Sequence, residues 1–219
     1  MNSIPFDGTM TDTGIKGIVD DLAEQGWSCR DGLLSNDMSD ALRQEAWQGW
    51  HASRFRQARV GTGRTKQLRN DIRNDHVQWL DPLSLTEAQQ HYFNLIRGLQ
   101  KAINHGLMMG LHTFEGHFAI YTPGASYTKH LDQFIGAHHR AVTSILYLNR
   151  AWQPADGGQL RLYTDENGTG DHVDLLPRQG RMITFLSGRF FHEVLPATRH
   201  RISLTGWHSI RPLNGEGLF

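Results

Sequence analysis

His130 and Asp132, two positions apart, have side chains that could bind one metal ion together. In an extended segment, residues i and i+2 point to the same face, so one ion can lie between these two side chains. His192, in the strand-like run 189–194, offers a third ligand. Two imidazoles and one carboxylate on one side of a metal leave coordination positions open, which is typical of non-haem Fe(II) sites that use dioxygen.

A second pair with the same spacing, His172 and Asp174, means that the pattern alone does not choose the ligands. We favour the first pair because about 60 residues, enough for several short strands, separate it from His192. His172 lies only about 20 residues before His192, which leaves room for little more than one hairpin. The turn-rich segment 165–170 before it favours surface positions for His172 and Asp174.

Arg201 follows in a segment of alternating character, 201–207, whose odd-numbered residues share one face. Arginine can bind a carboxylate through two parallel hydrogen bonds, which lysine cannot reproduce. A buried Arg201 would need such an anion, whereas a surface arginine would not. Arg199 lies on the same side, so the pattern leaves both interpretations open.

The elements that must position these residues follow from the apolar periodicity. Helical spacing predicts helices at 14–25, from 36 for about four or five turns, and from the capping box at Thr86 to about 107. A short strand is expected within 71–80. Beyond His112 the period changes to two, and strands are expected around 114–120, 142–148, 160–162, 173–175, 182–186 and 202–204.

This order predicts one α+β domain spanning 1–219, with helical support over about 14–110 and a strand-rich core over about 112–210. The helices should pack on one face of a largely antiparallel, barrel-like sheet.

Composition narrows the class of protein. The 22 basic residues balance the 22 acidic ones, so no overall field favours nucleic acid or an anionic membrane. The single cysteine, Cys29, excludes an intramolecular disulfide and agrees with a reducing compartment. The start of the chain does not look like a signal peptide, and no run of eighteen uncharged apolar residues occurs. We expect a cytoplasmic, monomeric protein.

One segment departs from this balance: basic residues crowd between Arg54 and Arg69, interrupted by Gly61 and Gly63. Such a segment could be a lid that folds over a substrate, a solvated loop, or a grip on nucleic acid. Between Gly61 and Arg69 no aromatic residue could stack on bases, so nucleic-acid binding is the least favoured interpretation.

The combined motifs resemble the iron- and 2-oxoglutarate-dependent dioxygenases, and within them the prolyl-hydroxylase branch of the oxygen-sensing type. The resemblance extends from the first helix to about Trp207 and is closest to bacterial members. For these, the implied substrate is a prolyl residue in elongation factor Tu. It is carried by His130-x-Asp132, His192 and Arg201, and by the segments 72–79, 121–127, 145–152 and 157–161.

The resemblance implies a double-stranded β-helix core of jelly-roll, cupin-like form. It implies Fe(II) on the three ligands named first, and 2-oxoglutarate with its distal carboxylate on Arg201. The Tyr147 hydroxyl would assist Arg201, and Tyr121 would lie beside the same cosubstrate. The implied reaction hydroxylates prolyl C4 with dioxygen and releases succinate and carbon dioxide; ascorbate is a further candidate cofactor.

For the substrate, the resemblance implies that the segment from about Arg59 to Asp75 closes over a bound peptide. The interval from Tyr121 to His130 is one residue shorter than in the animal enzymes, and the basic segment differs in composition. The residues implied to lie near the peptide are Arg140, Trp207, Tyr127, Arg73 and Asp75.

Two other functions are consistent with parts of the pattern. A 2-oxoglutarate-dependent nucleic-acid demethylase would use the basic segment. A non-catalytic barrel could bind a metal or small anion for a structural purpose. Neither nucleic acid nor a membrane is expected as a partner.

Overall fold

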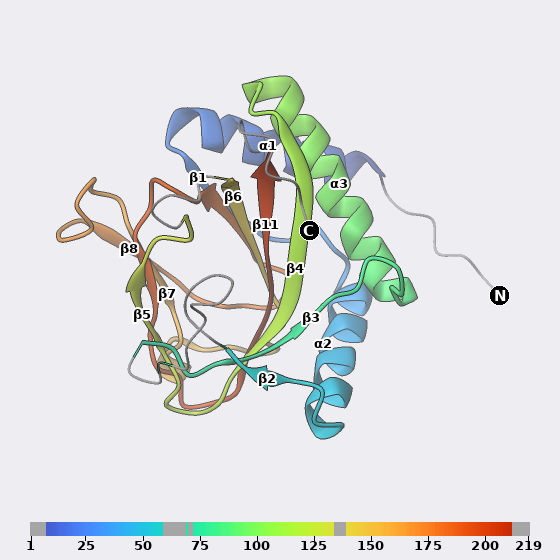
Figure 1. Ribbon diagram of the computed structural model, residues 1–219, viewed down its shortest axis with the longest axis vertical. Helices are drawn as coiled ribbons and strands as arrows, with labels where there is room; N and C mark the ends of the chain where they lie inside the picture. The colour runs from blue at the N-terminus through green and yellow to red at the C-terminus, as the bar shows by residue number, and fades with distance from the viewer. Residues whose placement is uncertain (1–7, 59–68, 70–71, 134–138, 212–219) are drawn as a thin grey trace.

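The structure, a computed structural model, describes residues 8–58, 69, 72–133 and 139–211. Most of the predicted lid between Arg59 and Asp75 therefore lies outside the described residues. Within them, helices and two antiparallel sheets form three layers, with the helices on one side of the larger sheet (Figure 1). The predicted α+β class and the position of the helices on one face are confirmed.

The helices begin where capping residues allow it. Ser35 accepts the Met38 N–H (3.2 Å) at the start of α2, and Thr86 accepts the Gln89 N–H (3.2 Å) at the start of α3, as predicted. The Gln89 side chain does not complete a capping box but donates to Glu45 of α2 (2.7 Å), which attaches one helix to the other. The helices are α1 (Gly8–Glu24), α2 (Asn36–His51), α3 (Glu87–Leu107) and the short 3-10 helix η2 (Pro154–Asp156).

The larger sheet has seven strands in the described residues. In spatial order they are β1 (Trp27–Arg30), β9 (Met182–Leu186), β6 (Arg140–Tyr147), β11 (Arg201–Ile210), β4 (Leu111–Tyr121), β3 (His76–Trp79) and β2 (Arg56–Gln57).

The smaller sheet has four strands, again within the described residues. Their order is β5 (Tyr127–His130), β10 (His192–Val194), β7 (Leu160–Tyr163) and β8 (His172–Leu175). From β4 onward the chain passes repeatedly between the two sheets, so β5 and β10, more than 60 residues apart, become neighbours.

The central strands of the larger sheet, β6 and β11, are buried on both faces because each face is covered. On β6, Leu146 packs in the core beneath the helices, whereas Ile145 and Tyr147 pack in a second core toward the smaller sheet. β11 alternates in the same way, with Ile202 and Leu204 on the helix side. Arg201 and the residues in phase with it therefore belong to the interior between the sheets.

Two strands were not predicted, the two-residue β2 and β1. β1 follows directly after α1 and pairs with the edge of β9. Its four residues include polar side chains and give no clear alternation. Ser28 and Arg30 both bond Asp21 of α1 (2.6 Å for Ser28; 2.7 and 2.9 Å for Arg30), and these bonds attach the strand to the helix.

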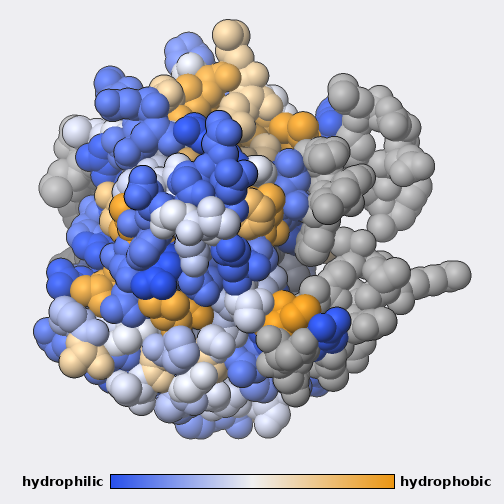
Figure 2. Space-filling model, turned by 90° about the vertical axis from the view of Figure 1, so that its left-hand side faces the viewer, coloured by the Kyte–Doolittle hydropathy of each residue, from blue (hydrophilic) through white to orange (hydrophobic). Residues whose placement is uncertain are grey.

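The outward side of the smaller sheet is polar. Arg161 donates two hydrogen bonds to Asp174 (2.8 and 2.9 Å) and lies 3.8 Å from Glu193. Seen from the side of β5, β7 and β8, the surface is largely hydrophilic, with apolar residues in small separate groups (Figure 2). None of the helices in the described part of the chain has the length and apolar character that crossing a bilayer requires.

The side chain of Asn149 joins the segment at Pro177 to Ile202, the residue after Arg201, and this leads to a prediction about stability. Its amide donates to Pro177 O (2.8 Å) and Ile202 O (3.0 Å) and accepts from Ile202 N–H (2.7 Å), all in the interior. Asn149→Ala should lower the free energy of unfolding by about 2–4 kcal/mol, because it leaves buried backbone groups without a partner.

Urea denaturation measures this loss, and Gln48→Ala at an exposed position of α2 serves as the control. The control should change the free energy of unfolding by less than about 0.5 kcal/mol. Equal stability of the two variants would show that Asn149 does not fasten this region.

Candidate active site

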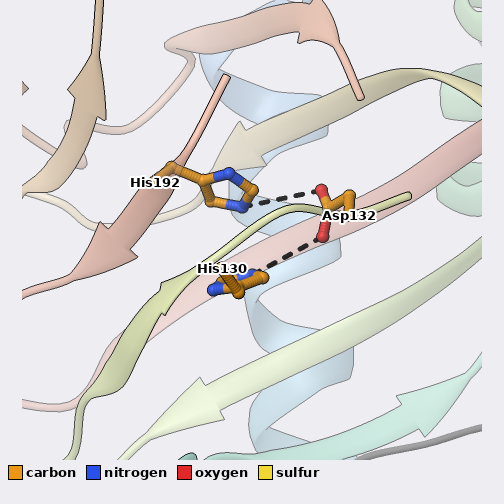
Figure 3. Close-up of side chains that lie close together, drawn as sticks. All are labelled: His130, Asp132 and His192. Atoms are coloured by element: carbon orange, nitrogen blue, oxygen red, sulfur yellow. Dashed lines mark ion pairs between the residues drawn. The ribbon is translucent and has the colours of Figure 1, made fainter. Parts of the chain in front are cut away.

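The pairing of β5 with β10 brings the two predicted histidine ligands together. His130 and His192 are register partners, and their ring centroids are 4.2 Å apart. Asp132 faces both rings from one side, with Oδ1 3.6 Å from His130 Nε2 and Oδ2 3.6 Å from His192 Nε2 (Figure 3). Each residue offers one ligand atom, and these atoms lie within 4.8 Å of one another.

Backbone carbonyls orient both imidazoles. His130 Nδ1 lies 2.7 Å from Thr128 O, and His192 Nδ1 lies 3.1 Å from Phe190 O. A carbonyl only accepts, so each Nδ1 carries a proton, and Nε2, the nitrogen on the side of Asp132, is the one available to bind a metal. Burial, with the neighbouring His130, lowers the pKa of His192 to about 4, which keeps it neutral near pH 7.

Asp132 is held as a carboxylate in a buried position. Its Oδ2 accepts from the Thr143 hydroxyl (2.8 Å), which in turn lies 2.8 Å from the Ser187 hydroxyl. Burial alone would raise the pKa of Asp132, but His192 and His130, which are protonated at the low pH where this carboxyl titrates, outweigh it and hold the pKa well below its usual range. The indole of Trp207 contributes to this lowering, although its N–H meets hydrogen-bond geometry with no described residue.

Two neutral imidazoles and one carboxylate on one side of a common space fit a ferrous ion. The rival pair is not part of this arrangement. His172 is exposed on β8, and Asp174 is engaged with Arg161 on the outer side of the smaller sheet. The structure thus separates two pairs that the sequence pattern left equivalent.

Arg201 is 2% exposed, which decides between the two interpretations of its pattern. Its Nε donates to Gly158 O (2.8 Å) and its Nη2 donates to the Tyr147 hydroxyl (3.2 Å). No described carboxylate forms an ion pair with it. A buried guanidinium is costly without an anion, so this side chain is suited to a carboxylate ligand.

Two tyrosines flank the guanidinium. The Arg201 Cζ lies 5.0 Å from the ring centroid of Tyr121, its register partner on β4, and 4.9 Å from that of Tyr147. Burial raises the pKa of Tyr147 despite the nearby Arg201, so its hydroxyl keeps a proton to donate. Gly158, at φ +68°, allows the close approach, since a Cβ there would lie 3.3 Å from Arg201 Cδ.

An aromatic wall leads from the surface to this interior, formed by Trp79, His117 and Trp207. Trp79 is 50% exposed on β3, and its ring lies 4.8 Å from His117, which lies 5.4 Å from Trp207. Arg140 stacks on Trp207 (3.7 Å) and bonds Glu115 (2.6 and 3.0 Å). Burial and then the charge of Arg73 lower the pKa of His117 to about 3, so the wall contains a neutral imidazole.

The other residues implied to meet the peptide lie beside His130. Tyr127 stacks on His130, and Arg73 lies over the far face of Tyr127. Asp75 is fully buried and pairs with Arg73 through two hydrogen bonds (2.8 and 2.6 Å). Contact of these residues with a peptide stays a prediction.

Sequence reasoning did not place Thr143, His117 or Trp79 in the site, although Trp79 belongs to a segment that carries the family resemblance. Thr143 is in phase with Tyr147 on β6, so the alternation that marks the helix-facing residues also marks Thr143 as facing inward. His117 is in phase with Tyr121 on β4 by the same rule. Trp79 gives no such signal, because half of its surface is exposed.

Comparisons with known proteins agree with this geometry. Residues 116–209 match the model of the 2OG-Fe(II) oxygenase superfamily. A crystal structure of a Pseudomonas putida prolyl-4-hydroxylase is 42% identical, covers 90% of this chain and 100% of its own, and gives a TM-score of 0.81. The chain belongs to the 2OG-Fe(II) oxygenase superfamily, in its prolyl 4-hydroxylase type. The double-stranded β-helix, and Fe(II) with 2-oxoglutarate, are confirmed as the fold and cofactors.

Two further relatives carry a description of their target. A prolyl hydroxylase from Trichoplax adhaerens, in complex with a hypoxia inducible factor oxygen degradation domain peptide fragment, is 25% identical, covers 95% of this chain and 94% of its own, and gives a TM-score of 0.82. A hypoxia-inducible factor prolyl hydroxylase of Caenorhabditis elegans is 31% identical over 201 residues. The match takes in 87% of this chain but only 27% of that protein's length.

The Thr143 hydrogen bond to Asp132 generates a prediction about metal affinity. Thr143→Val removes the bond at nearly constant volume and should weaken Mn(II) binding about 10-fold, because partners that orient a ligand are typically worth this much. Isothermal titration without 2-oxoglutarate measures it. Thr184→Val is the control, since Thr184 is equally buried on β9 and its hydroxyl bonds no described residue. Loss of affinity in both variants, or in neither, would contradict the role of Thr143.

The burial of Arg201 generates a second prediction. Arg201→Lys should weaken 2-oxoglutarate binding to the Mn(II)-loaded protein at least about 10-fold, because an ammonium cannot make two parallel bonds to a carboxylate. Arg199→Lys is the control, because Arg199 is exposed and bonds Asp156 (3.0 Å). Calorimetric titration that gave equal affinities for the two variants would remove Arg201 from the cosubstrate site.

Proposed function

We propose that this protein hydroxylates prolyl C4 in a protein substrate, using Fe(II), 2-oxoglutarate and dioxygen and releasing succinate and carbon dioxide. The observation that carries the proposal is the common inward face of β6. Thr143 on this face bonds Asp132 of the metal-ligand set, and Tyr147 on the same face bonds Arg201. A metal-ligand set and an unpaired guanidinium thus line one interior, as a ligand that binds both would require.

The ferrous ion, when bound with 2-oxoglutarate, supplies the activation of dioxygen that aliphatic hydroxylation needs. The side chains have three tasks. His130, Asp132 and His192 hold the ion on one side. Arg201 and the Tyr147 hydroxyl bind and orient the distal carboxylate. The apolar core between the sheets excludes water from the reacting atoms.

The aromatic wall of Trp79, His117 and Trp207 supports an extended prolyl segment as the substrate class. Aromatic-lined grooves are a common means of recognising proline-containing peptides, since extended proline segments lose little entropy on binding. Trp207 is the register partner of Thr143, so the inner end of the wall adjoins the metal ligands. We infer that the peptide lies along this wall, with Arg140 at its edge.

Elongation factor Tu is the proposed target. The support is the resemblance to bacterial members of the branch, together with the 42% identity to a bacterial prolyl-4-hydroxylase. The structure with a bound peptide fragment is that of a relative and illustrates that this fold can accept a peptide. The expected cytoplasmic location and monomeric state stay predictions, as does the use of ascorbate.

The nucleic-acid demethylase has less support. It depended on basic residues of the segment 54–69, half of which lie outside the described residues. Relatives with substantial identity are described as prolyl hydroxylases. Membership of the enzyme family argues against the non-catalytic barrel.

The test is oxygen transfer to purified elongation factor Tu. The Fe(II)-loaded protein should place one labelled oxygen from ¹⁸O₂ on a prolyl residue, with one succinate per event, as measured by mass spectrometry. His130→Ala and Asp132→Ala should abolish both products, whereas Asp174→Ala, the matched change in the rival pair, should retain them.

Prompt turnover in the His130 or Asp132 variant would contradict the proposed site. Labelling of another protein in a cell lysate, with elongation factor Tu untouched, would instead overturn only the identity of the target.

A further inference from the structure

The orientation of the His130 ring requires more than its own hydrogen bond. Its side chain is 15% exposed, compared with 4% for His192. The bond from Nδ1 to Thr128 O fixes one edge of the ring but leaves the ring free to tilt about that bond. His192, in contrast, also packs edge-on against Phe185, with centroids 4.8 Å apart.

The missing restraint is a stack between Tyr127 and His130. Their ring centroids are 3.6 Å apart and their planes differ by 13°. Residues three apart in a regular strand point to opposite faces. Here the register shifts, because Tyr127 and His130 pair with Val194 and His192, three positions on β5 against two on β10. The extra residue of this bulge turns Tyr127 to the face of His130.

The far face of Tyr127 is covered in turn. The Arg73 Cζ lies 4.4 Å from the Tyr127 ring centroid, close enough for a cation–π contact. The guanidinium is fixed by its two hydrogen bonds to the fully buried Asp75. The stack is therefore a series of three planar groups, Arg73, Tyr127 and His130, with Asp75 bonded to its outer member.

The backbone keeps the two sides of this stack in place. Arg73 and Tyr127 form an antiparallel bridge, and Thr128 N–H donates to Ile72 O (2.8 Å). Ser126 N–H donates to the Asn74 side chain (2.7 Å). The segment 72–75 is thus attached along β5, immediately before the metal ligand.

We propose that Tyr127 and the Arg73–Asp75 pair are positioning residues for the metal: they hold the His130 imidazole at the angle at which Nε2 meets the ion. The proposal rests on the metal site of the proposed function, but not on the identity of the substrate. The aromatic ring of Tyr127 is the required part, and its hydroxyl is not. The metal site accordingly depends on residues that make no contact with the ion.

Metal affinity, measured without 2-oxoglutarate or peptide, tests the proposal. Isothermal titration with Mn(II) should give Tyr127→Phe the affinity of the unaltered protein within about 2-fold, whereas Tyr127→Leu should weaken binding about 10-fold or more. Tyr163→Leu is the control, since Tyr163 lies in the smaller sheet and bonds Glu193 (2.7 Å) rather than a metal ligand. Thermal unfolding of each variant establishes that it is folded.

Arg73→Lys provides a second variant that keeps a positive charge beside Asp75. Lysine lacks the planar group that covers Tyr127, so Mn(II) affinity should fall several-fold, less than in Tyr127→Leu. If Tyr127→Leu does not fold, this variant decides the question.

Three results would overturn the proposal. Unchanged Mn(II) affinity in Tyr127→Leu, with only a raised KM for a prolyl peptide, would make Tyr127 a peptide contact alone. Equal losses in the phenylalanine and leucine variants would assign the effect to the hydroxyl. Unchanged Mn(II) affinity in Arg73→Lys would show that Arg73 does not position the His130 ring. A failure to detect prolyl hydroxylation would not change these Mn(II) affinities. Failure of the proposed function can therefore be distinguished from failure of this proposal.

Discussion

The antiparallel pairing of β5 with β10 is the interaction on which the site depends. It joins segments more than 60 residues apart and sets His130 opposite His192. The register decides the chemistry, because a slip of one residue would turn one imidazole to the outer, hydrated side of the smaller sheet. The apolar contacts between the two sheets, including Phe185 and Phe190, stabilise that register. The core thus fixes the metal ligands before any ion binds.

Buried charge is distributed unevenly in this interior. Arg73 and Asp75 neutralise each other within the protein, whereas Asp132 and Arg201 lack such a partner of opposite charge among the described lysines, arginines and carboxylates. An ion pair in the interior costs desolvation, but a single buried charge costs more. In the proposed function a cation completes Asp132 and an anion completes Arg201, so metal and 2-oxoglutarate would together meet both deficits. The same arrangement that destabilises the empty protein gives it affinity for its ligands.

Much of this could be predicted from the sequence, because alternation identifies faces. The phase of Arg201, the spacing of His130 and Asp132, and the capping residue Thr86 could all be identified in the sequence. The choice between two His-x-Asp pairs required an argument about strand number, because local spacing is identical in both. The pair distant from His192 in sequence is the one beside it in space, because the chain alternates between the two sheets.

Other features follow from tertiary structure and could not be predicted. The bulge that turns Tyr127 toward His130 has no sequence mark, since regular alternation predicts the opposite face. β1 is too short and too polar for a period to show. Arg73 and Asp75 were associated with the substrate; their pairing is local, but the bridge that brings Arg73 to Tyr127 joins segments more than 50 residues apart. Such features come from packing between segments rather than from local pattern.

The central claim is that the three ligands hold one ferrous ion to which 2-oxoglutarate binds while its far carboxylate lies on Arg201. Anaerobic titration of 2-oxoglutarate into the Fe(II)-loaded protein, followed by visible charge-transfer absorption, tests it most directly. The account predicts a band that saturates at one cosubstrate per iron and per chain, and that forms only at much higher 2-oxoglutarate concentrations when Arg201 is lysine. A protein that binds iron without developing the band, or a lysine variant with the same titration curve, would contradict it.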